Sequence, residues 1–153
     1  MSLIKLSLTI LFTLFFTNSV YADQLTVTDG DTIRIGEERI RFSGIDAPEL
    51  KQTCLYQEIE FNCGEFSKNL LIEKISNQEV SCIIESNDQY GRTLAECFVG
   101  KDSLSSYLVR EGYAFAYRKY SDQFIIDEEY AQSKGNGMWS MQFIFPWEYR
   151  RQK

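Results

Sequence analysis

Residues 29–49 read DGDTIRIGEERIRFSGIDAPE and carry an unusual density of charge for a stretch that otherwise favours β-structure. Two β-rich runs, residues 32–35 and 39–45, flank the turn-forming letters GEE. Apolar and basic residues alternate in the second run, as expected of a strand with one buried face. Arg39 and Arg41 then lie together on the polar face. The pattern predicts a β-hairpin with Ile40 and Phe42 on one face and both guanidinium groups on the other.

Carboxylates mark the ends of these predicted strands. Asp31 lies in the turn before the first run, Asp46 ends the second, and Glu49 follows three residues later, after a proline. Carboxylates at strand ends can meet over the mouth of a small barrel, where their oxygens suit a hard cation such as Ca²⁺ or Mg²⁺. Arg41, and Arg92 in the turn-forming DQYGR, suit a phosphodiester under attack. The alternative is that these charges stay apart as solvated turn and strand residues.

The rest of the chain continues the mixed pattern. The predicted elements are helices over residues 64–75, 103–110 and 125–134 and strands over residues 24–28, 79–85 and 92–100. No repeat or linker divides the chain, and the βαβ repetition of a doubly wound sheet is missing. We therefore expect one domain, a small mixed β-barrel with helices.

The first 22 residues have a different character. A single lysine precedes the apolar run 6–16, and Val-Tyr-Ala follows at residues 20–22, which is typical of a secretory signal peptide. The apolar run is short for a membrane span, although an uncleaved anchor is the alternative. We expect a signal peptide over residues 1–22 and one domain over residues 23–153. The mature protein would be secreted or periplasmic, without a membrane partner.

Charge and composition narrow the chemistry. The whole chain has a net charge of −6, and loss of the signal peptide leaves 15 basic and 22 acidic residues, a charge near −7. A nucleic-acid partner would therefore have to be held by local charge or by a bound cation. The chain has no histidine, which excludes Ser-His and Cys-His hydrolases and nucleases with a histidine base. Acid–base chemistry falls to Glu, Asp, Lys or Tyr with metal-activated water.

Four cysteines form an even set, and export favours disulfides over a zinc site. A hairpin centred between residues 89 and 90 places Cys82 opposite Cys97, at roughly 4.5–5.5 Å between Cα atoms. A disulfide accepts that distance. Cys54 then pairs with Cys63 by elimination.

Several ordered motifs resemble those of the staphylococcal-nuclease-like, or thermonuclease, family. They are DGDT (29–32), Arg41, IDAPE (45–49), DQYGRTLA (88–95), LVREGYAFAYRKYS (108–121) and GMW (137–139). The resemblance covers nearly the whole predicted mature chain. It implies an OB-fold, a five-stranded barrel with three helices, that hydrolyses DNA and RNA with Ca²⁺ and leaves 3′-phosphate ends.

The resemblance also implies roles for individual residues. Asp31 and Asp46 would be carboxylate ligands of Ca²⁺, and the backbone carbonyl of Ala47 would be a third ligand. Glu49 would orient or deprotonate the attacking water. The remaining two roles belong to Arg41 and Arg92, which would bind the phosphate and stabilise the transition state.

Some neighbouring residues leave alternatives open. Arg39 is a second candidate for the phosphate arginine, although its spacing to the acids favours Arg41. Asp29 fits a turn residue better than a ligand. Tyr90 and Tyr117 are candidates to stack on bases, with ordinary packing as the alternative, and Tyr120 is a weaker candidate.

This sequence departs from the family pattern at three places. Ala47 replaces a usual threonine, Gln89 replaces a lysine, and the residues after Glu49 lack the expected lysine-rich loop. These changes bear on nucleotide binding more than on catalysis. We expect a monomeric nuclease that prefers single strands, because a narrow mouth accepts an unpaired strand most readily. The alternatives are a catalytically weak OB-fold that binds single-stranded nucleic acid or a protein, and a disulfide-braced structural domain.

Overall fold

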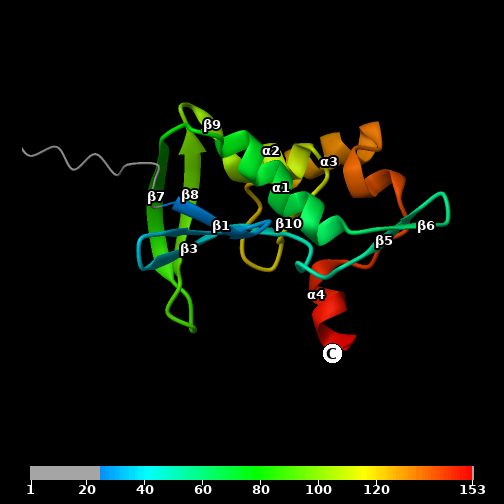
Figure 1. Cartoon of the computed structure of the whole chain (residues 1–153), viewed down its shortest axis with the longest axis horizontal. Coiled ribbons are helices and arrows are strands. Elements are labelled where there is room, and N and C mark those ends of the chain that lie inside the picture. The colour runs from blue at the N-terminus through cyan, green and yellow to red at the C-terminus, as the bar shows by residue number, and fades with distance from the viewer. Residues whose placement is uncertain (1–24, 153) are drawn as a thin grey trace, which may run out of the picture.

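The computed structural model describes residues 25–152, so the predicted signal peptide over residues 1–22 lies outside the described part of the chain. Figure 1 shows a sheet at one end of the molecule and helices beside it. The strands of this sheet are β1 (Leu25–Asp29), β2 (Thr32–Ile35), β3 (Glu38–Phe42), β7 (Val80–Asn87), β8 (Thr93–Val99) and β9 (Asp102–Ser103). Their order is β1-β2-β3-β8-β7, with β9 paired to β8.

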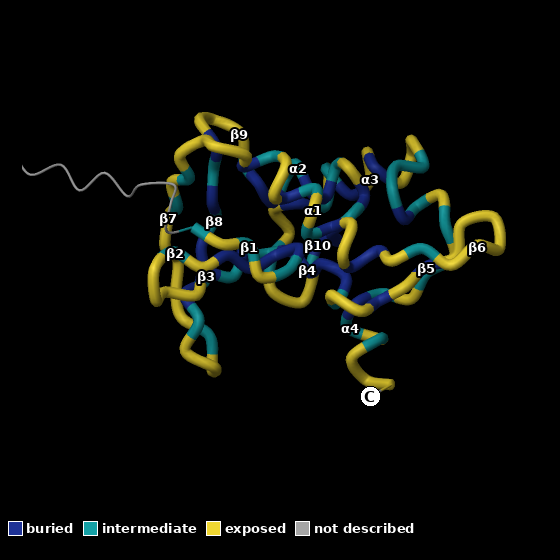
Figure 2. Tube along the Cα trace, in the orientation of Figure 1, coloured by how far each residue is buried: buried dark blue, intermediate teal, exposed yellow. Residues whose placement is uncertain are grey.

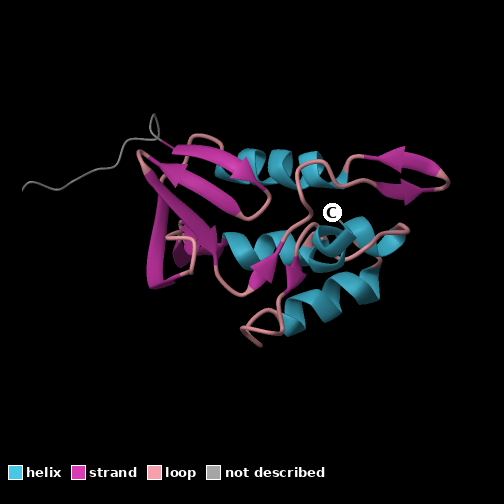
Figure 3. Ribbon diagram, turned by 90° about the horizontal axis from the view of Figure 1, so that it is seen from below, coloured by secondary structure: helices cyan, strands magenta, loops and turns pink. Residues whose placement is uncertain are grey.

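One pairing in this sheet is parallel and the others are antiparallel. Strand β3, which carries Arg39 and Arg41, runs parallel to β8, and β8 forms an antiparallel hairpin with β7. Two small sheets complete the β-structure. Strand β4 (Ile45–Asp46) pairs with β10 (Phe115–Ala116), and β5 (Cys54–Tyr56) pairs with β6 (Ile59–Phe61). The β5–β6 hairpin projects at the end of the molecule away from the large sheet (Figure 3).

The helical segments fill the middle of the molecule and its C-terminal end (Figure 1). They are α1 (Cys63–Ile75), α2 (Leu104–Arg110), α3 (Ile125–Lys134) and α4 (Pro146–Tyr149), with 3₁₀ turns η2 (Gly137–Ser140) and η3 (Arg150–Gln152). Side-chain caps explain two of the starts: Asn62 accepts the amide of Glu65 in α1, and Ser103 accepts that of Ser106 in α2. None of the helices within residues 25–152 combines the length and apolar character needed to cross a bilayer.

The predicted mixed fold of strands and helices is confirmed, with differences in detail. The described residues contain four α-helices where three were expected, because Pro146 starts an additional short helix near the C-terminus. The pairings within residues 25–152 leave β1 and β7 as the edges of the large sheet, so this sheet is not a closed barrel. The expected single strand over residues 39–45 is wrong. It breaks at Gly44, whose φ of 71° turns the chain so that β4 joins β10 instead.

Two groups of buried side chains hold these parts together. Figure 2 shows along the chain trace which residues are buried. The larger group joins the sheet to the long helices and includes Ile33, Phe42, Leu71 and Leu108. The smaller group surrounds Phe115 and continues into the C-terminal segment, residues 142–152. Its other members include Cys54, Cys63, Met138, Trp139, Phe143, Phe145 and Trp147. The second core therefore fixes the C-terminal segment against β10.

Both predicted disulfides are present. Cys82 and Cys97 are directly opposed in the β7–β8 ladder, with Cα atoms 4.1 Å apart. Cys54 and Cys63 join the start of β5 to the start of α1 across 6.0 Å. The second bridge encloses the β5–β6 hairpin, which the sequence did not predict. It braces the chain just after the predicted acidic site.

Candidate active site

A cleft of about 990 Å³ opens along the ends of β1, β3 and β4 and reaches the β7–β8 turn. Its walls contain nearly all the residues singled out from the sequence. They include Asp31, Arg41, Asp46, Ala47, Glu49, Tyr90, Arg92 and Tyr117, together with the open candidates Asp29, Arg39 and Tyr120. Side chains from distant parts of the chain thus share one cavity, as the sequence predicted.

Asp31 is fixed by its neighbours in the β1–β2 turn. Its amide donates to Asp29 Oδ1 at 3.1 Å, and its Oδ2 accepts from the amide of Ala47 at 2.9 Å. Gly30 is needed between the two acids, because a Cβ there would collide with Ser67 Oγ and crowd Ala47 Cβ. The turn therefore aims the Asp31 carboxylate at the segment that follows β4.

Asp46 and Asp31 converge on the same guanidinium. Asp46 is 0% exposed, and its Oδ1 accepts from Arg41 Nη2 at 2.8 Å. The same nitrogen lies 3.4 Å from Asp31 Oδ2. Arg41 Nη1 donates to the carbonyls of Phe42 and Ile45, and these bonds orient the guanidinium so that Nη2 faces the two acids. Arg39, the alternative arginine, is exposed on β3 and contacts neither acid in the described structure.

The pKa values of the charged groups in the cleft depend on two opposing effects, the burial of each group and its contacts with groups of opposite charge. Burial raises the pKa of Asp46, while the hydrogen bond from Arg150 works against this increase. Burial and the nearby Asp31 charge raise the pKa of Asp29 to about 6. Burial disfavours the charge on Arg41, but the charges of Asp31 and Asp46 outweigh it and raise the pKa of Arg41. Arg150 and Arg41 therefore favour the charged form of Asp46 against the effect of its burial.

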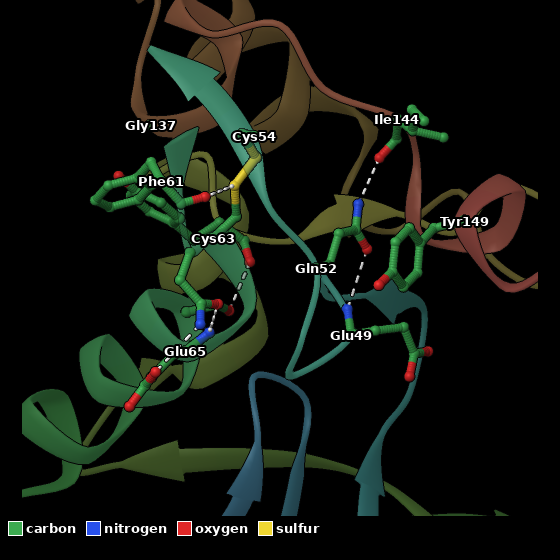
Figure 4. Close-up of a disulfide and its surroundings, with 12 residues drawn as sticks. Glu49, Gln52, Cys54, Phe61, Cys63, Glu65, Gly137, Ile144 and Tyr149 are labelled. Carbon is green, nitrogen blue, oxygen red and sulfur yellow. Dashed lines mark hydrogen bonds between the residues drawn. A yellow bond between two sulfur atoms is a disulfide. The ribbon is translucent and has the colours of Figure 1, made fainter. Parts of the chain in front are cut away.

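Glu49 is held through its backbone by Gln52, a residue that the sequence reasoning missed. The buried Gln52 side chain accepts the Glu49 amide at 3.1 Å and donates to the Ile144 carbonyl at 2.6 Å (Figure 4). Gln52 N also donates to the Glu49 carbonyl at 2.7 Å. The loop that carries Glu49 is thus tied to the C-terminal segment and to the Cys54–Cys63 bridge beside it.

Arg150 is the second functional candidate that the sequence reasoning missed. Its Nη2 lies 2.7 Å from Asp46 Oδ2, and its Nη1 donates to Asp46 Oδ1 at 3.1 Å and to Glu49 Oε1 at 2.9 Å. Burial works against the charge on Arg150, but the hydrogen bonds to Asp46 and Glu49 raise its pKa. The sequence FPWEYRRQK predicts docking of Phe145 and Trp147 onto the barrel, with a basic tail that touches phosphate as the weaker alternative. The docking is confirmed, since both rings contact Phe115, but neither interpretation placed Arg150 beside the acids.

Arg92 lies at the other end of the cleft, where the β7–β8 turn holds it. Its Nε donates to Asp88 Oδ2 at 2.7 Å. Tyr90 is 76% exposed, with the Arg92 guanidinium 5.8 Å from its ring centre, so it can offer a face to a base. Tyr117 is more confined, because Trp147 stacks on it at 5.7 Å and Tyr120 meets it edge-on at 4.9 Å. Stacking on a base by Tyr117 remains a prediction.

The oxygen donors in the cleft suit a hard divalent cation. Two carboxylates already share one positive group in this structure, and neither histidine nor free cysteine competes for the metal. Within residues 25–152, no three acidic side chains form a ready-made cluster. Asp31, Asp46 and the Ala47 carbonyl remain the predicted ligands of Ca²⁺, and water would have to complete the coordination. The residues present fit such an ion.

Comparison with known proteins points the same way. The family model described as "Staphylococcal nuclease homologue" matches residues 39–141. The match includes Arg41, Asp46, Glu49 and Arg92, whereas Asp31 precedes it. Residues 142–153 follow the matched region.

Curated relatives align over most of this chain. An "Uncharacterized endonuclease" of Haemophilus influenzae is 32% identical over 83% of this chain and 71% of its own length. The "Thermonuclease" of Staphylococcus hyicus is 32% identical over 76% of this chain and 73% of its own length. A protein of Rhizobium meliloti named "Succinoglycan biosynthesis protein ExoI" is 34% identical over 78% of this chain and 64% of its own length.

Proposed function

Because the chain belongs to the staphylococcal nuclease homologue family, we propose that it is an exported, Ca²⁺-dependent nuclease of DNA and RNA. It cleaves phosphodiester bonds irrespective of the sugar and leaves 3′-phosphate ends. The names of the endonuclease and thermonuclease relatives support nucleic-acid hydrolysis. The two disulfides support an oxidising compartment, the periplasm or the exterior.

The observation that carries this proposal is the convergence of Asp31 and Asp46 on Arg41 inside the large cleft. A structural domain has no need to bury two acids against one guanidinium, because taking even paired charges out of water costs desolvation free energy. A phosphodiesterase needs such a set, since charge grows on the phosphate oxygens as the water attacks.

Each residue then has a defined role. Glu49 accepts a proton from the attacking water, whose oxygen forms the new bond to phosphorus. The bond from phosphorus to the 5′ oxygen breaks and that oxygen takes a proton from a solvent water, leaving a 3′-phosphate and a 5′-hydroxyl. Arg41 and Arg92 bind the equatorial phosphate oxygens from two sides of the cleft. Asp31 and Asp46 would hold Ca²⁺, which would supply further positive charge to the same phosphate oxygens.

The finer features follow from the shape of the site. The strand order β1-β2-β3-β8-β7 supports the proposal that these five strands correspond to those of an OB-fold. A cleft with one set of catalytic groups favours an unpaired strand over a duplex. We therefore propose preference for single strands, stacking of a base on Tyr90 or Tyr117, and a monomeric enzyme with no membrane partner.

The experiment is cleavage of single-stranded DNA and RNA oligonucleotides by the mature chain, first with CaCl₂ and then with a chelator. We expect cleavage with Ca²⁺ only, and 3′-phosphate ends on the products. Glu49→Gln should lower kcat by ~10²-fold or more. The matched control is Glu37→Gln, an exposed acid in the β2–β3 turn, which should keep the wild-type rate. Cleavage that persists in chelator, or a fully active Glu49→Gln enzyme, would reject the proposal.

A further inference from the structure

The last residues of the chain form part of the cleft although they lie beyond the family match. We call residues 142–152 the C-terminal segment. Its start pairs with β5, since the amide and carbonyl of Gln142 exchange two hydrogen bonds of 2.9 Å with Leu55. Further on, the Ile144 carbonyl accepts from Gln52, and the Tyr149 hydroxyl lies 3.2 Å from the Lys51 carbonyl. The segment is therefore bound along the loop that carries Glu49.

Aromatic packing gives the C-terminal segment a fixed seat. Phe143, Phe145 and Trp147 all contact the buried ring of Phe115, with ring centres 5.1 to 6.3 Å apart. Trp147 also lies flat between Phe145 and Tyr117, at 4.6 and 5.7 Å. Helix α4 and turn η3 follow this anchor directly (Figure 1). The anchor thus delivers Arg150 to the cleft.

Arg150 binds Asp46, which under the proposed function is a ligand of the cation. Both Asp46 oxygens accept hydrogen bonds from the Arg150 guanidinium, and Oδ1 also accepts from Arg41. Asp46 is 0% exposed, so it has few other directions in which to present a lone pair. The Arg150 side chain is 39% exposed, which gives it room to leave.

We propose that the C-terminal segment is a latch in which Arg150 competes with the divalent cation for Asp46. The inference rests on the cation site of the proposed function. A carboxylate oxygen that accepts a hydrogen bond at 2.7 Å cannot offer the same lone pair to a metal. A guanidinium at that place also repels a second positive charge. Cation affinity is then reduced by the fraction of molecules in which the latch is open.

The test is calorimetric titration of CaCl₂ into the metal-free mature protein, without any nucleic acid. Arg150→Gln should bind Ca²⁺ about tenfold more tightly than the wild type, which corresponds to a wild-type latch that is open in about one tenth of the molecules. The matched control is Arg151→Gln, because Arg151 is exposed and donates to no cleft acid in the described structure. It should bind Ca²⁺ like the wild type. Arg150→Lys keeps the charge, so its affinity for Ca²⁺ should lie between those of the wild type and Arg150→Gln.

A second measurement follows from the reciprocity of coupled binding. If Ca²⁺ displaces Arg150, Ca²⁺ should speed amide hydrogen exchange in residues 146–152 of the wild type. Arg150→Gln should show fast exchange there with or without Ca²⁺. This readout remains informative if the variant folds poorly, because the wild type alone reports the displacement.

The outcomes separate the latch from the proposed function. If wild type and Arg150→Gln bind Ca²⁺ with equal affinity, or the variant binds more weakly, the latch is overturned while the cation site stands. If Ca²⁺ protects residues 146–152 in the wild type, the latch is likewise overturned. If neither the wild type nor any variant binds Ca²⁺ at millimolar concentration, the proposed cation site is rejected, and the latch is rejected with it.

Discussion

Asp88 and Arg92 close the turn between β7 and β8, with Arg92 Nε 2.7 Å from Asp88 Oδ2. Asp88 Oδ1 also accepts the amides of Tyr90 and Arg92, both at 2.9 Å. One carboxylate therefore sets the turn and orients a guanidinium that faces the cleft. Within residues 25–152 the contact of the Arg92 side chain with Asp88 is made by Nε, and we propose that its two terminal nitrogens bind the phosphate.

Loss of this carboxylate should disturb catalysis more than stability. We expect Asp88→Ala to lower kcat by about tenfold, less than the ~10²-fold loss expected for Arg92→Ala, because the arginine is still present but misplaced. The free energy of unfolding should fall by no more than about 1 kcal/mol, as for other surface ion pairs. Steady-state kinetics and urea unfolding measure both effects. Asp102→Ala, which removes the ion pair with Lys74, is the matched control and should keep full activity. An Asp88→Ala enzyme with wild-type kcat would show that the turn does not position Arg92.

Gly64 gives a test of how Glu49 is placed. A Cβ on Gly64, in the first turn of α1, would overlap the backbone carbonyl of Glu49. Gly64→Ala should push that loop outward and lower kcat by about tenfold, with a loss of about 1–3 kcal/mol in the free energy of unfolding. Asn69→Ala, at an exposed position of the same helix, should leave kcat unchanged. Full activity of Gly64→Ala would mean that the position of Glu49 tolerates the shift.

Asp29 should make the metal-free protein less stable as the pH rises. Its pKa is about 6 in the folded chain against an ordinary value of 3.8, so the unfolded chain releases the proton first between these values. Folded molecules then bind more protons than unfolded ones, and stability falls as pH increases from about 4 to about 6. Asp29→Asn removes this loss and should be more stable above pH 6, by about 1–3 kcal/mol, and equal near pH 4.

Urea unfolding in chelator at pH 4, 5, 6 and 7 measures the difference. Chelator is needed because a bound cation would change the charge near Asp29. Parallel stability curves for the wild type and Asp29→Asn across this range would contradict the raised pKa.

The two disulfides should differ in their effect on catalysis. Each closes a short loop, and loss of either should cost about 2–3 kcal/mol of folding free energy. Cys82→Ala with Cys97→Ala removes a bridge within the β7–β8 ladder and should leave kcat near the wild-type value. Cys54→Ala with Cys63→Ala frees the chain just after Gln52, so kcat should also fall. Thermal unfolding and kinetics of both double variants test this difference. Equal kcat values would contradict it.

Local patterns predicted the parts of the fold that local forces decide. Alternation along β3 placed Arg41 on the polar face, and counting from the turn paired Cys82 with Cys97. The break at Gly44 escaped prediction, because a glycine inside a β-rich run does not announce whether the chain turns there. The β5–β6 hairpin escaped for a similar reason, since its sequence lacks clear alternation.

The missed site residues depend on contacts between distant parts of the chain. Gln52 meets Ile144 across 92 residues, and Arg150 meets Asp46 across 104. No periodicity in the sequence reports such a contact, because it follows from how the aromatic side chains of the C-terminal segment pack around Phe115. Asp31, Arg41 and Asp46 could be predicted from the sequence, because strand ends that are close in sequence also meet in space.

The most direct test of the central claim is cleavage of a single-stranded oligonucleotide as a function of free Ca²⁺, compared between the wild type and Asp46→Asn. The account predicts saturation by Ca²⁺ for the wild type and at least ~10²-fold lower turnover for the variant at the same Ca²⁺ concentration. Superimposable curves, or wild-type turnover that is indifferent to Ca²⁺, would contradict the assignment of this cleft as a cation-dependent nuclease site.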